Sequence, residues 1–383
     1  MADAQGRMRV AVLGAGGLGK AAARIMSMKR EVCLSAICDS RGIAASAEGL
    51  PGEAVAGLSG DLVEGVQRWQ EDGEDAAGPV GRPARSNGVG GVATLTAVEA
   101  RPSTSLGTVL SEPRLQAGRV EARHCDDPIG EVLGMADRLD AVLVALPNLP
   151  NEFIPGVMAR FASAGASLAF VDVLKRTRAV EQMFGLDPQV KAAQSVVMTG
   201  CGATPGMLAA AAVLAAQSFI EVEKVDIWWG VGIANWDAYK ATIREDIAHL
   251  AGYTVERAKA MSDAEVEALL AQTDGLLELR EMEHADDLLL ARVGVVDERS
   301  QVEVGGVMDT RRPRKPVSTT MTLTGRTFEG KRASHTFILG DETTMSANVI
   351  GPALGYLKRA LWLKAHGLFG VFGSTEFLPM VVR

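Results

Sequence analysis

The feature that most constrains the fold is a glycine-rich segment near the N-terminus. Gly14-Ala15-Gly16-Gly17-Leu18-Gly19 has the spacing G-x-G-x-x-G and follows a short apolar run, Met8 to Leu13. An apolar run that ends in glycines is typical of a buried parallel strand, and Lys20 to Lys29 then reads as a helix. A strand, a glycine-rich turn and a helix in this order predict the first unit of a dinucleotide-binding domain.

Each glycine of this segment has its own expected role. Gly14 permits the tight turn, Gly16 lets the backbone approach a pyrophosphate, and Gly19 lets the helix pack closely on the strand. The start of the helix adds free N–H groups and a positive dipole end, which favour phosphate. We therefore expect cofactor contacts from Gly14, Gly16, Gly17, Leu18 and Gly19. The alternative is a glycine-rich turn that binds nothing.

Asp39 ends the next apolar run, Cys33 to Cys38. An acidic residue about 20 residues after the glycines accepts hydrogen bonds from the adenosine ribose and repels a 2′-phosphate, which favours NAD. Ser40 and Arg41 come directly after it, and an arginine here can accommodate that phosphate, so NADP stays open. The alternative is an aspartate that only begins a turn.

Apolar runs and helical segments alternate as far as Thr199. Strands are expected over Val120–His124, Ala141–Leu146, Ser167–Val173 and Ser195–Thr199, and helices over Gly130–Arg138 and Asn151–Ala164. This rhythm predicts an α/β Rossmann fold with a doubly wound parallel sheet. Residues 71–116 break it, because they are rich in Gly, Ala, Pro, Arg and Ser. We expect a surface insertion there, at least partly disordered.

The pattern changes after Gly206 and predicts a second, α+β domain. Strands are expected over Val222–Gly232, Leu288–Val296, Val302–Met308, Val317–Leu323 and Ser334–Leu339, and helices over Trp236–Ala251 and Ser262–Leu270. Met345–Ala365 reads as a long helix interrupted near Pro352. The resulting division is a cofactor domain over 1–205, a substrate and oligomerisation domain over 206–345, and a C-terminal helix over 346–383 that returns to the first domain.

Composition excludes several classes of partner. The formal net charge is −8, and an acidic chain is repelled on average by nucleic acid and by anionic membranes. The four cysteines form no C-x-x-C pair and no zinc-type spacing with histidines, so we expect reduced thiols, no metal and a cytoplasmic location. The longest apolar run, Gly206 to Ile220, is shorter than the ~20 residues that span a bilayer. We expect a homo-oligomer that binds a small molecule.

Lys175 is the most informative single residue. It follows the expected strand Ser167–Val173, and the carboxyl ends of parallel strands form the ligand-binding edge of such sheets. Lysine attacks a carbonyl only as the neutral amine, and we expect Arg176 or Arg178 to lower its pKa while holding a substrate carboxylate. The alternative is a basic loop in solvent.

Three other segments are expected at the same edge. Ala145, Leu146, Pro147 and Asn148 follow one strand and should border the nicotinamide ribose, unless they form a plain turn. The loop Gly200–Gly206 follows the next strand, and Cys201, Gly202 and Thr204 are candidate substrate contacts, unless the loop is only a hinge. His284, between acidic residues that should raise its pKa, is the candidate acid or base, unless it lies at the surface.

Outside 71–116 the chain resembles the saccharopine-dehydrogenase-like oxidoreductases, and among them the carboxylating dehydrogenases of biotin biosynthesis. The resemblance rests on Gly14–Gly19, Lys175, the loop Gly200–Gly206 and His284. In that family a lysine on the matching loop gives up its own ε-amino group, with a histidine near the same site. The resemblance therefore implies that Lys175 is an amino donor and that His284 is catalytic.

The resemblance also implies a reaction. The lysine amine condenses with the ketone of 8-amino-7-oxononanoate, NAD(P)H reduces the imine, bicarbonate carboxylates the neighbouring amino group, and NAD(P)+ reoxidises the lysine side. Hydrolysis then releases the carbamate of 7,8-diaminononanoate and leaves an aldehyde on the protein, once per chain. Two alternatives stay open: an imine or amino-acid dehydrogenase with many turnovers, in which Lys175 is an acid or base, and a dinucleotide sensor without catalysis.

Overall fold

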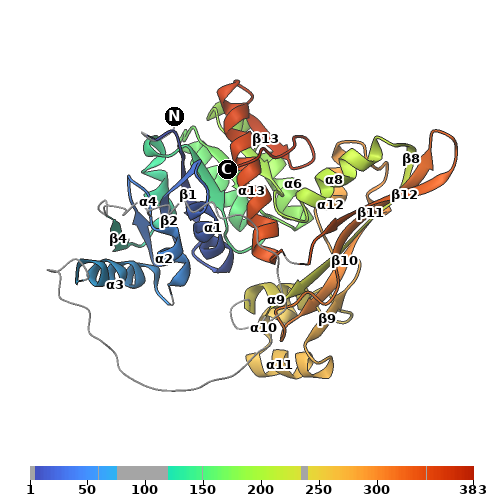
Figure 1. The fold of residues 1–383 in the computed structure, drawn as a ribbon, viewed down its shortest axis with the longest axis horizontal. Helices are drawn as coiled ribbons and strands as arrows, with labels where there is room; N and C mark the ends of the chain where they lie inside the picture. Colours follow the sequence, from blue (N-terminus) through green and yellow to red (C-terminus); the bar gives the residue numbers. More distant parts are fainter. Residues whose placement is uncertain (1–4, 59, 76–119, 149, 234–239, 342) are drawn as a thin grey trace, which may run out of the picture.

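The computed structural model describes residues 5–58, 60–75, 120–148, 150–233, 240–341 and 343–383. These residues form an eight-stranded and a five-stranded sheet, each with its own helices, and the long helix α13 lies between them (Figure 1). Of the expected insertion at 71–116, only 71–75 are described, and they form the end of helix α3 (Leu62–Asp75). The rest of that prediction lies outside the described residues.

The first sheet has the strand order β13-β7-β6-β5-β1-β2-β3-β4. Its strands are β1 Met8–Leu13, β2 Val32–Cys38, β3 Gly42–Ala45, β4 Glu121–His124, β5 Ala141–Val144, β6 Ala169–Asp172, β7 Val196–Thr199 and β13 Gly370–Gly373. Every neighbouring pair from β13 to β2 is parallel, as the Rossmann prediction requires. The strand order reverses at β1, which lies between β5 and β2 and is where such sheets bind their cofactors.

The far edge of this sheet differs from the prediction. The segment expected as a further parallel strand, Val120–His124, forms β4, which is antiparallel to β3. Strand β3, not expected at all, is antiparallel to β2. Only three residues join β2 to β3, and a connection this short allows the antiparallel direction alone.

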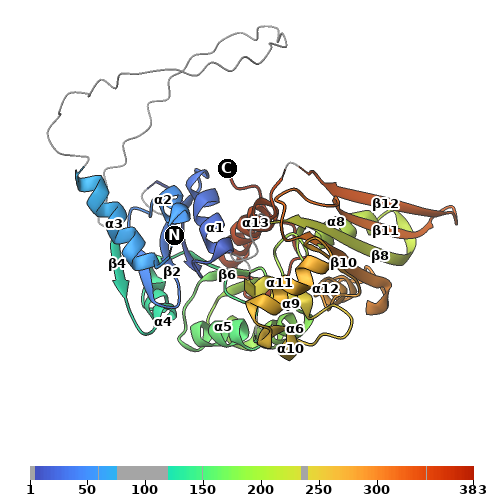
Figure 2. The ribbon, with the colours of Figure 1, turned by 90° about the horizontal axis from the view of Figure 1, so that it is seen from below.

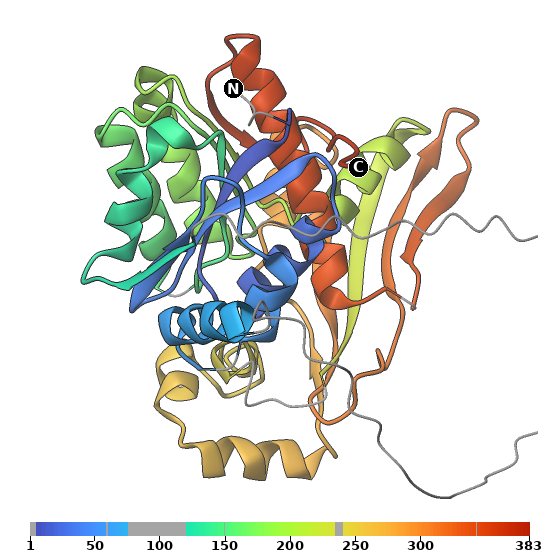
Figure 3. The same cartoon turned by 60° about the vertical axis from the view of Figure 1, so that its left-hand side comes forward.

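Helices cover both faces of the first sheet, so its strands are apolar without alternation. The core on one face includes α1 (Gly17–Ser27) and α13 (Met345–Ala365), and Figure 3 shows these on one side of the strands. The other core gathers α4 (Pro128–Leu133), α5 (Phe153–Ser163), α6 (Thr177–Gly185) and α7 (Asp187–Ala192). The C-terminal segment therefore contributes strand β13 to the first sheet and helix α13 to the core on one of its faces.

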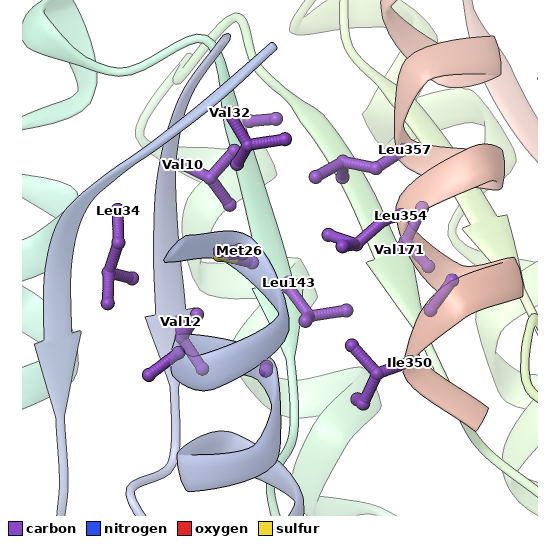
Figure 4. Packing of buried hydrophobic residues seen from close by; sticks show 14 of the residues in the cluster. Val10, Val12, Met26, Val32, Leu34, Leu143, Val171, Ile350, Leu354 and Leu357 are labelled. Atoms are coloured by element: carbon purple, nitrogen blue, oxygen red, sulfur yellow. The ribbon is translucent and has the colours of Figure 1, made fainter. Parts of the chain in front are cut away.

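Helix α13 is continuous, and the expected interruption at Pro352 was wrong. A proline inside a helix removes one backbone hydrogen bond, and packing of the apolar face can offset this loss. Figure 4 shows that face: Ile350, Leu354 and Leu357 point from α13 toward the strands, where Leu143 and Val171 lie. Apolar contacts lie on both sides of the proline, from Ile350 before it to Leu363 after it, and they hold the helix along the sheet.

The second sheet has the order β12-β11-β8-β10-β9, with β8 parallel to β10 and all other neighbours antiparallel. Its strands are β8 Phe219–Gly232, β9 Leu276–Leu279, β10 Val302–Asp309, β11 Thr319–Thr327 and β12 Arg332–Leu339. Its core includes side chains of α8 Met207–Ala216, α9 Lys240–Ile247, α10 Val255–Ala260, α11 Asp263–Gln272 and α12 Asp286–Arg292. Figure 2 shows β8, β11 and β12 side by side beyond α13.

One expected strand of this domain is a helix. Leu288–Val296 was predicted as a strand, whereas most of it belongs to α12. Leu289 packs in the core of the first domain and Leu290 in the core of the second, so this helix is apolar on two sides. A short run of consecutive apolar residues does not separate a buried strand from a helix buried on two sides.

Candidate active site

The glycine loop has room for a side chain at Gly16 and none at Gly14 or Gly19. A Cβ atom at Gly19 would lie 1.7 Å from the Gly14 carbonyl oxygen, and one at Gly14 would lie 2.5 Å from the Ala145 carbonyl oxygen. Gly14 also has φ +104°, which favours glycine. A Cβ at Gly16, by contrast, has nothing within 4 Å. The chain itself therefore requires Gly14 and Gly19, while Gly16 faces open space at the start of α1.

Asp39 serves the turn between β2 and β3. Its Oδ1 accepts hydrogen bonds from the backbone N–H groups of Arg41 at 2.8 Å and Gly42 at 3.1 Å. Ser40 and Arg41 are exposed, and the Arg41 guanidinium lies 3.4 Å from Asp61. One carboxylate oxygen thus caps the turn, and the prediction that Asp39 also faces a ribose stays a prediction.

The loops after β1, β5, β6 and β7 open at the same edge of the sheet, because these strands are parallel. Ala145 after β5 contacts the glycine loop, and its backbone N–H donates to Leu13. Leu146 and Asn148 are half-buried and Pro147 is exposed. This places the glycine loop, residues 145–148 and Lys175 around one edge.

Lys175 does not lie among cations, as the sequence suggested. Its Nζ donates to Asp246 Oδ1 at 2.9 Å and lies 3.6 Å from Glu245 Oε2. Both acids are buried and belong to α9 of the second domain. Burial alone would lower the pKa of Lys175, but the negative charges of Asp246 and Glu245 outweigh it and raise the pKa above the ordinary lysine value. The expectation that neighbouring arginines lower this pKa is corrected, since the nearest charges are carboxylates.

The two arginines after Lys175 lie in different surroundings. Arg176 is buried, and its guanidinium contacts Asn151 at 3.1 Å and Glu283 at 2.5 Å, with Glu245 at 3.7 Å. Arg178 has a side chain 69% exposed and lies 3.8 Å from Glu152. Arg176 therefore borders the lysine, and Arg178 points away from it.

His284 belongs to a small buried network. Its Nδ1 lies 2.6 Å from Asp286 Oδ2, which also accepts a hydrogen bond from the Thr204 hydroxyl at 2.7 Å. This contact fixes the orientation of the imidazole ring through Nδ1. The backbone N–H of Ala285 donates to the Lys175 carbonyl oxygen at 2.7 Å. The network thus joins three of the predicted segments, although no contact between the His284 ring and the lysine amine is observed.

His249 is a titratable neighbour that the sequence analysis did not single out. Burial, followed by the positive charges of Lys175 and Arg176, lowers the pKa of His249 to about 4. A neutral imidazole therefore lies within the electrostatic field of the lysine. Glu245, Asp246 and Glu283 were missed as well.

Asp172, the last residue of β6, holds the start of the loop after β7 by hydrogen bonds. Its Oδ1 accepts from the backbone N–H groups of Leu174 and Gly200 and from the Thr199 hydroxyl, at 2.9 to 3.1 Å. The Cys201 side chain is 0% exposed and lies in the first core, so its thiol cannot contact a substrate and is removed from the candidate set. Gly202 is buried beside Gly206, and the Thr204 hydroxyl links the loop to Asp286 beside His284.

Asp172 makes stability depend on pH. Burial raises its pKa to about 6, only partly opposed by its three hydrogen-bond donors, and Oδ2 has no partner among the described residues. The fold therefore favours the protonated acid, a stabilisation that is present below about pH 4 and lost as the pH rises through about 6. We expect the free energy of unfolding of Asp172→Asn, relative to wild type, to rise by on the order of 2–3 kcal/mol between pH 4 and 7.

Urea denaturation at several pH values measures this difference. Asp297→Asn, at an exposed position after α12, is the control and should keep a nearly constant difference from wild type. A constant difference for Asp172→Asn too would mean that this carboxyl does not have a raised pKa.

Among the described residues, no helix is long and apolar enough to cross a membrane. Within the same residues, no group of three His, Cys, Asp or Glu side chains could hold a metal ion.

Solved structures share this architecture. DAP dehydrogenase of C. glutamicum in complex with DAP has a TM-score of 0.50 and 15% identity, over 97% of this chain and 94% of that chain. An engineered D-amino acid dehydrogenase gives the same four values. The latter has also been solved bound to NADP+, at a TM-score of 0.48, 14% identity and the same coverage. The Rossmann sheet with an open glycine loop after its first strand is the fold that this chain shares with these dehydrogenases.

The sequence comparison identifies the family. No family model matches the chain. (S)-8-amino-7-oxononanoate synthase BioU of Haloferax mediterranei is 40% identical to it over 373 residues, which are 96% of this chain and 98% of that protein. The chain therefore belongs to the BioU family of biotin-pathway enzymes, and the resemblance to NAD(P)-dependent dehydrogenases is confirmed.

Proposed function

We propose that this chain converts 8-amino-7-oxononanoate into the carbamate of 7,8-diaminononanoate, once per protein, with Lys175 giving its amino group. The observation that carries the proposal is the position of Lys175: a partly buried amine at the edge of the sheet where the glycine loop opens. The relative is named as a synthase of (S)-8-amino-7-oxononanoate. Consumption of that compound by this chain is our proposal.

The residues at the edge of the sheet fit a dinucleotide. Gly16 leaves open space where α1 begins, and a helix start offers N–H groups to phosphate. Gly14, Gly17, Leu18 and Gly19 would hold the pyrophosphate, Asp39 and Ser40 the ribose, and residues 145–148 the nicotinamide end. We propose NAD as the cofactor and leave NADP open, because Arg41 is beside the ribose position.

Lys175 would act as a reactant. As the neutral amine it adds to the ketone carbon, and loss of water leaves an imine. A nicotinamide held by residues 145–148 would supply the hydride for that carbon and would later accept one from the lysine Cε. Water then adds to the new Cε=N bond, the C–N bond breaks, and nitrogen leaves with the product. Two electrons pass from Cε to the substrate, so the cofactor is unchanged overall.

The other groups orient and carboxylate the substrate. Bicarbonate adds to the amino group beside the former ketone, which gives a carbamate and water. Arg176 is the proposed partner of an anionic group, because its Nη1 is buried without a hydrogen bond to any described residue. His284, held by Asp286, is the proposed proton carrier, and Gly202 and Thr204 would border the substrate.

The test is stoichiometry together with mass. With excess 8-amino-7-oxononanoate, NAD(P)H and bicarbonate, product should stop near one equivalent per chain. The peptide with Lys175 should become lighter by about one mass unit, because CH₂NH₂ becomes an aldehyde. Linear product formation with an unmodified Lys175, or net synthesis of 8-amino-7-oxononanoate, would contradict the proposal.

The raised pKa of Lys175 favours a second candidate function. A lysine held as the ammonium can donate a proton to a substrate, which suits an imine or amino-acid dehydrogenase with many turnovers. The same stoichiometry experiment separates the two functions, since this enzyme would exceed one equivalent and keep its lysine.

We further propose a homo-oligomer in the cytoplasm. Strand β12 is an edge strand exposed along most of its length, and Ile338 and Phe337 on it are 59% and 40% exposed. Exposed apolar side chains on a sheet edge favour contact with another chain.

A further inference from the structure

Two buried carboxylates meet one lysine amine. The side chains of Glu245 and Asp246 are only 6% and 3% exposed, and both lie within 3.6 Å of Lys175 Nζ. Burying an acid is costly unless it is paired and hydrogen-bonded, so two acids are more than the amine alone requires. Arg176, 3.7 Å from Glu245, is the other cation in contact.

One of these carboxylate oxygens is still without a partner. Oε1 of Glu245 accepts no hydrogen bond from any described residue, although it is buried. It faces Nη1 of Arg176 across 3.7 Å, which is too long for a hydrogen bond. A buried acceptor without a donor among the described residues is a place where the donor group of a ligand can bind.

The proposed substrate carries such a donor in the right place. Its amino group is on the carbon beside the ketone and is an ammonium at neutral pH. Once Lys175 adds to the ketone, two nitrogens are on adjacent carbons, about 3 Å apart given bonds near 1.5 Å long. Any carboxylate that reaches the lysine nitrogen is then close to the substrate ammonium.

We propose that Glu245 and Asp246 form the subsite for this ammonium and thereby select α-amino ketones over simple ketones. This inference rests on the proposed function only in placing the ketone at Lys175. When the ammonium enters, it adds a third positive charge beside Glu245 and Asp246, where Lys175 and Arg176 already lie, and Arg176 also pairs with Glu283. Repulsion then favours the neutral amine of Lys175, whose proton leaves to solvent. Substrate binding would itself activate the nucleophile.

The first experiment needs no chemistry at the ketone. In Lys175→Ala, the carboxylates should bind 8-aminononanoate at least about tenfold more tightly than nonanoate by calorimetry, and the amine should raise the melting temperature. Adding Asp246→Asn or Glu245→Gln should remove the preference. Adding Asp226→Asn should not, because that carboxylate pairs with Lys224 elsewhere in the domain. Equal affinities of Lys175→Ala for 8-aminononanoate and nonanoate would overturn the proposal.

The second experiment uses the wild-type chain, which covers the case in which Lys175→Ala does not fold. Borohydride should trap the imine at Lys175 at least about tenfold faster with 8-amino-7-oxononanoate than with 7-oxononanoate, and Asp246→Asn should abolish the difference. Equal trapping of both ketones would overturn the subsite. No trapping of either, with the amine preference intact in the first experiment, would overturn the proposed function and uphold the subsite.

Discussion

Lys175→Arg is expected to abolish product formation and to leave NADH affinity unchanged. A guanidinium stays protonated at any accessible pH and cannot add to a ketone. It can still pair with Asp246 and Glu245, which avoids the ~3–5 kcal/mol penalty of leaving buried charges without a partner. The substitution therefore tests the chemistry of residue 175 more cleanly than alanine does.

A product assay measures the loss of activity in Lys175→Arg, and calorimetry with NADH measures whether its cofactor affinity is unchanged. Lys191→Arg is the control, because Lys191 is an exposed lysine of the same domain that pairs with Asp187. It should give a full equivalent of product. Any product from Lys175→Arg above the background without enzyme would mean that the amine is not the reactant.

Gly16→Val is expected to eliminate NADH binding in a protein that still folds. A Cβ at this position meets nothing within 4 Å, so the apo fold tolerates it, whereas the added side chain would occupy the place of the pyrophosphate. Gly19→Val would be uninformative, since its Cβ would collide with the Gly14 carbonyl. The expected effect is a loss of at least about 100-fold in affinity, or ~3 kcal/mol.

The matched control is Gly156→Val on the exposed side of α5, where a Cβ also has open space. It should bind NADH like wild type. Unchanged affinity of Gly16→Val, with circular dichroism that matches the control, would place the dinucleotide away from the glycine loop.

The sequence predicted the first domain better than the second, and the reason is locality. The segments Met8–Leu13 and Gly14–Gly19 fix a strand, a turn and a helix within about 20 residues. Strand β3 is only four residues long, and β13 returns from the end of the chain, so neither has a pattern strong enough to identify. In the second domain, α12 is apolar on two sides because it packs into two cores. Its consecutive apolar residues therefore looked like a buried strand.

The lysine was predictable, and its partners were not. Lys175 follows a strand directly, while Asp246 is 71 residues away and comes from the other domain. A signal was present: Ile243, Asp246 and Ile247 have the i, i+3, i+4 spacing of one helix face, and both isoleucines are buried. A charged residue on an apolar face indicates a buried partner of opposite charge. Its identity could not be read without the fold.

The buried acids around Lys175 also have a meaning for the protein after its one reaction. If the amine leaves with the product, the aldehyde that remains carries no charge, and Asp246 loses its hydrogen-bonded cation. Removal of one partner from a buried ion pair costs about 3–5 kcal/mol, a large part of the stability of an ordinary domain. Because the pair joins the two domains, their contact would weaken first. A used molecule would then open and unfold more readily than an unused one, and proteases could clear it without any separate mark.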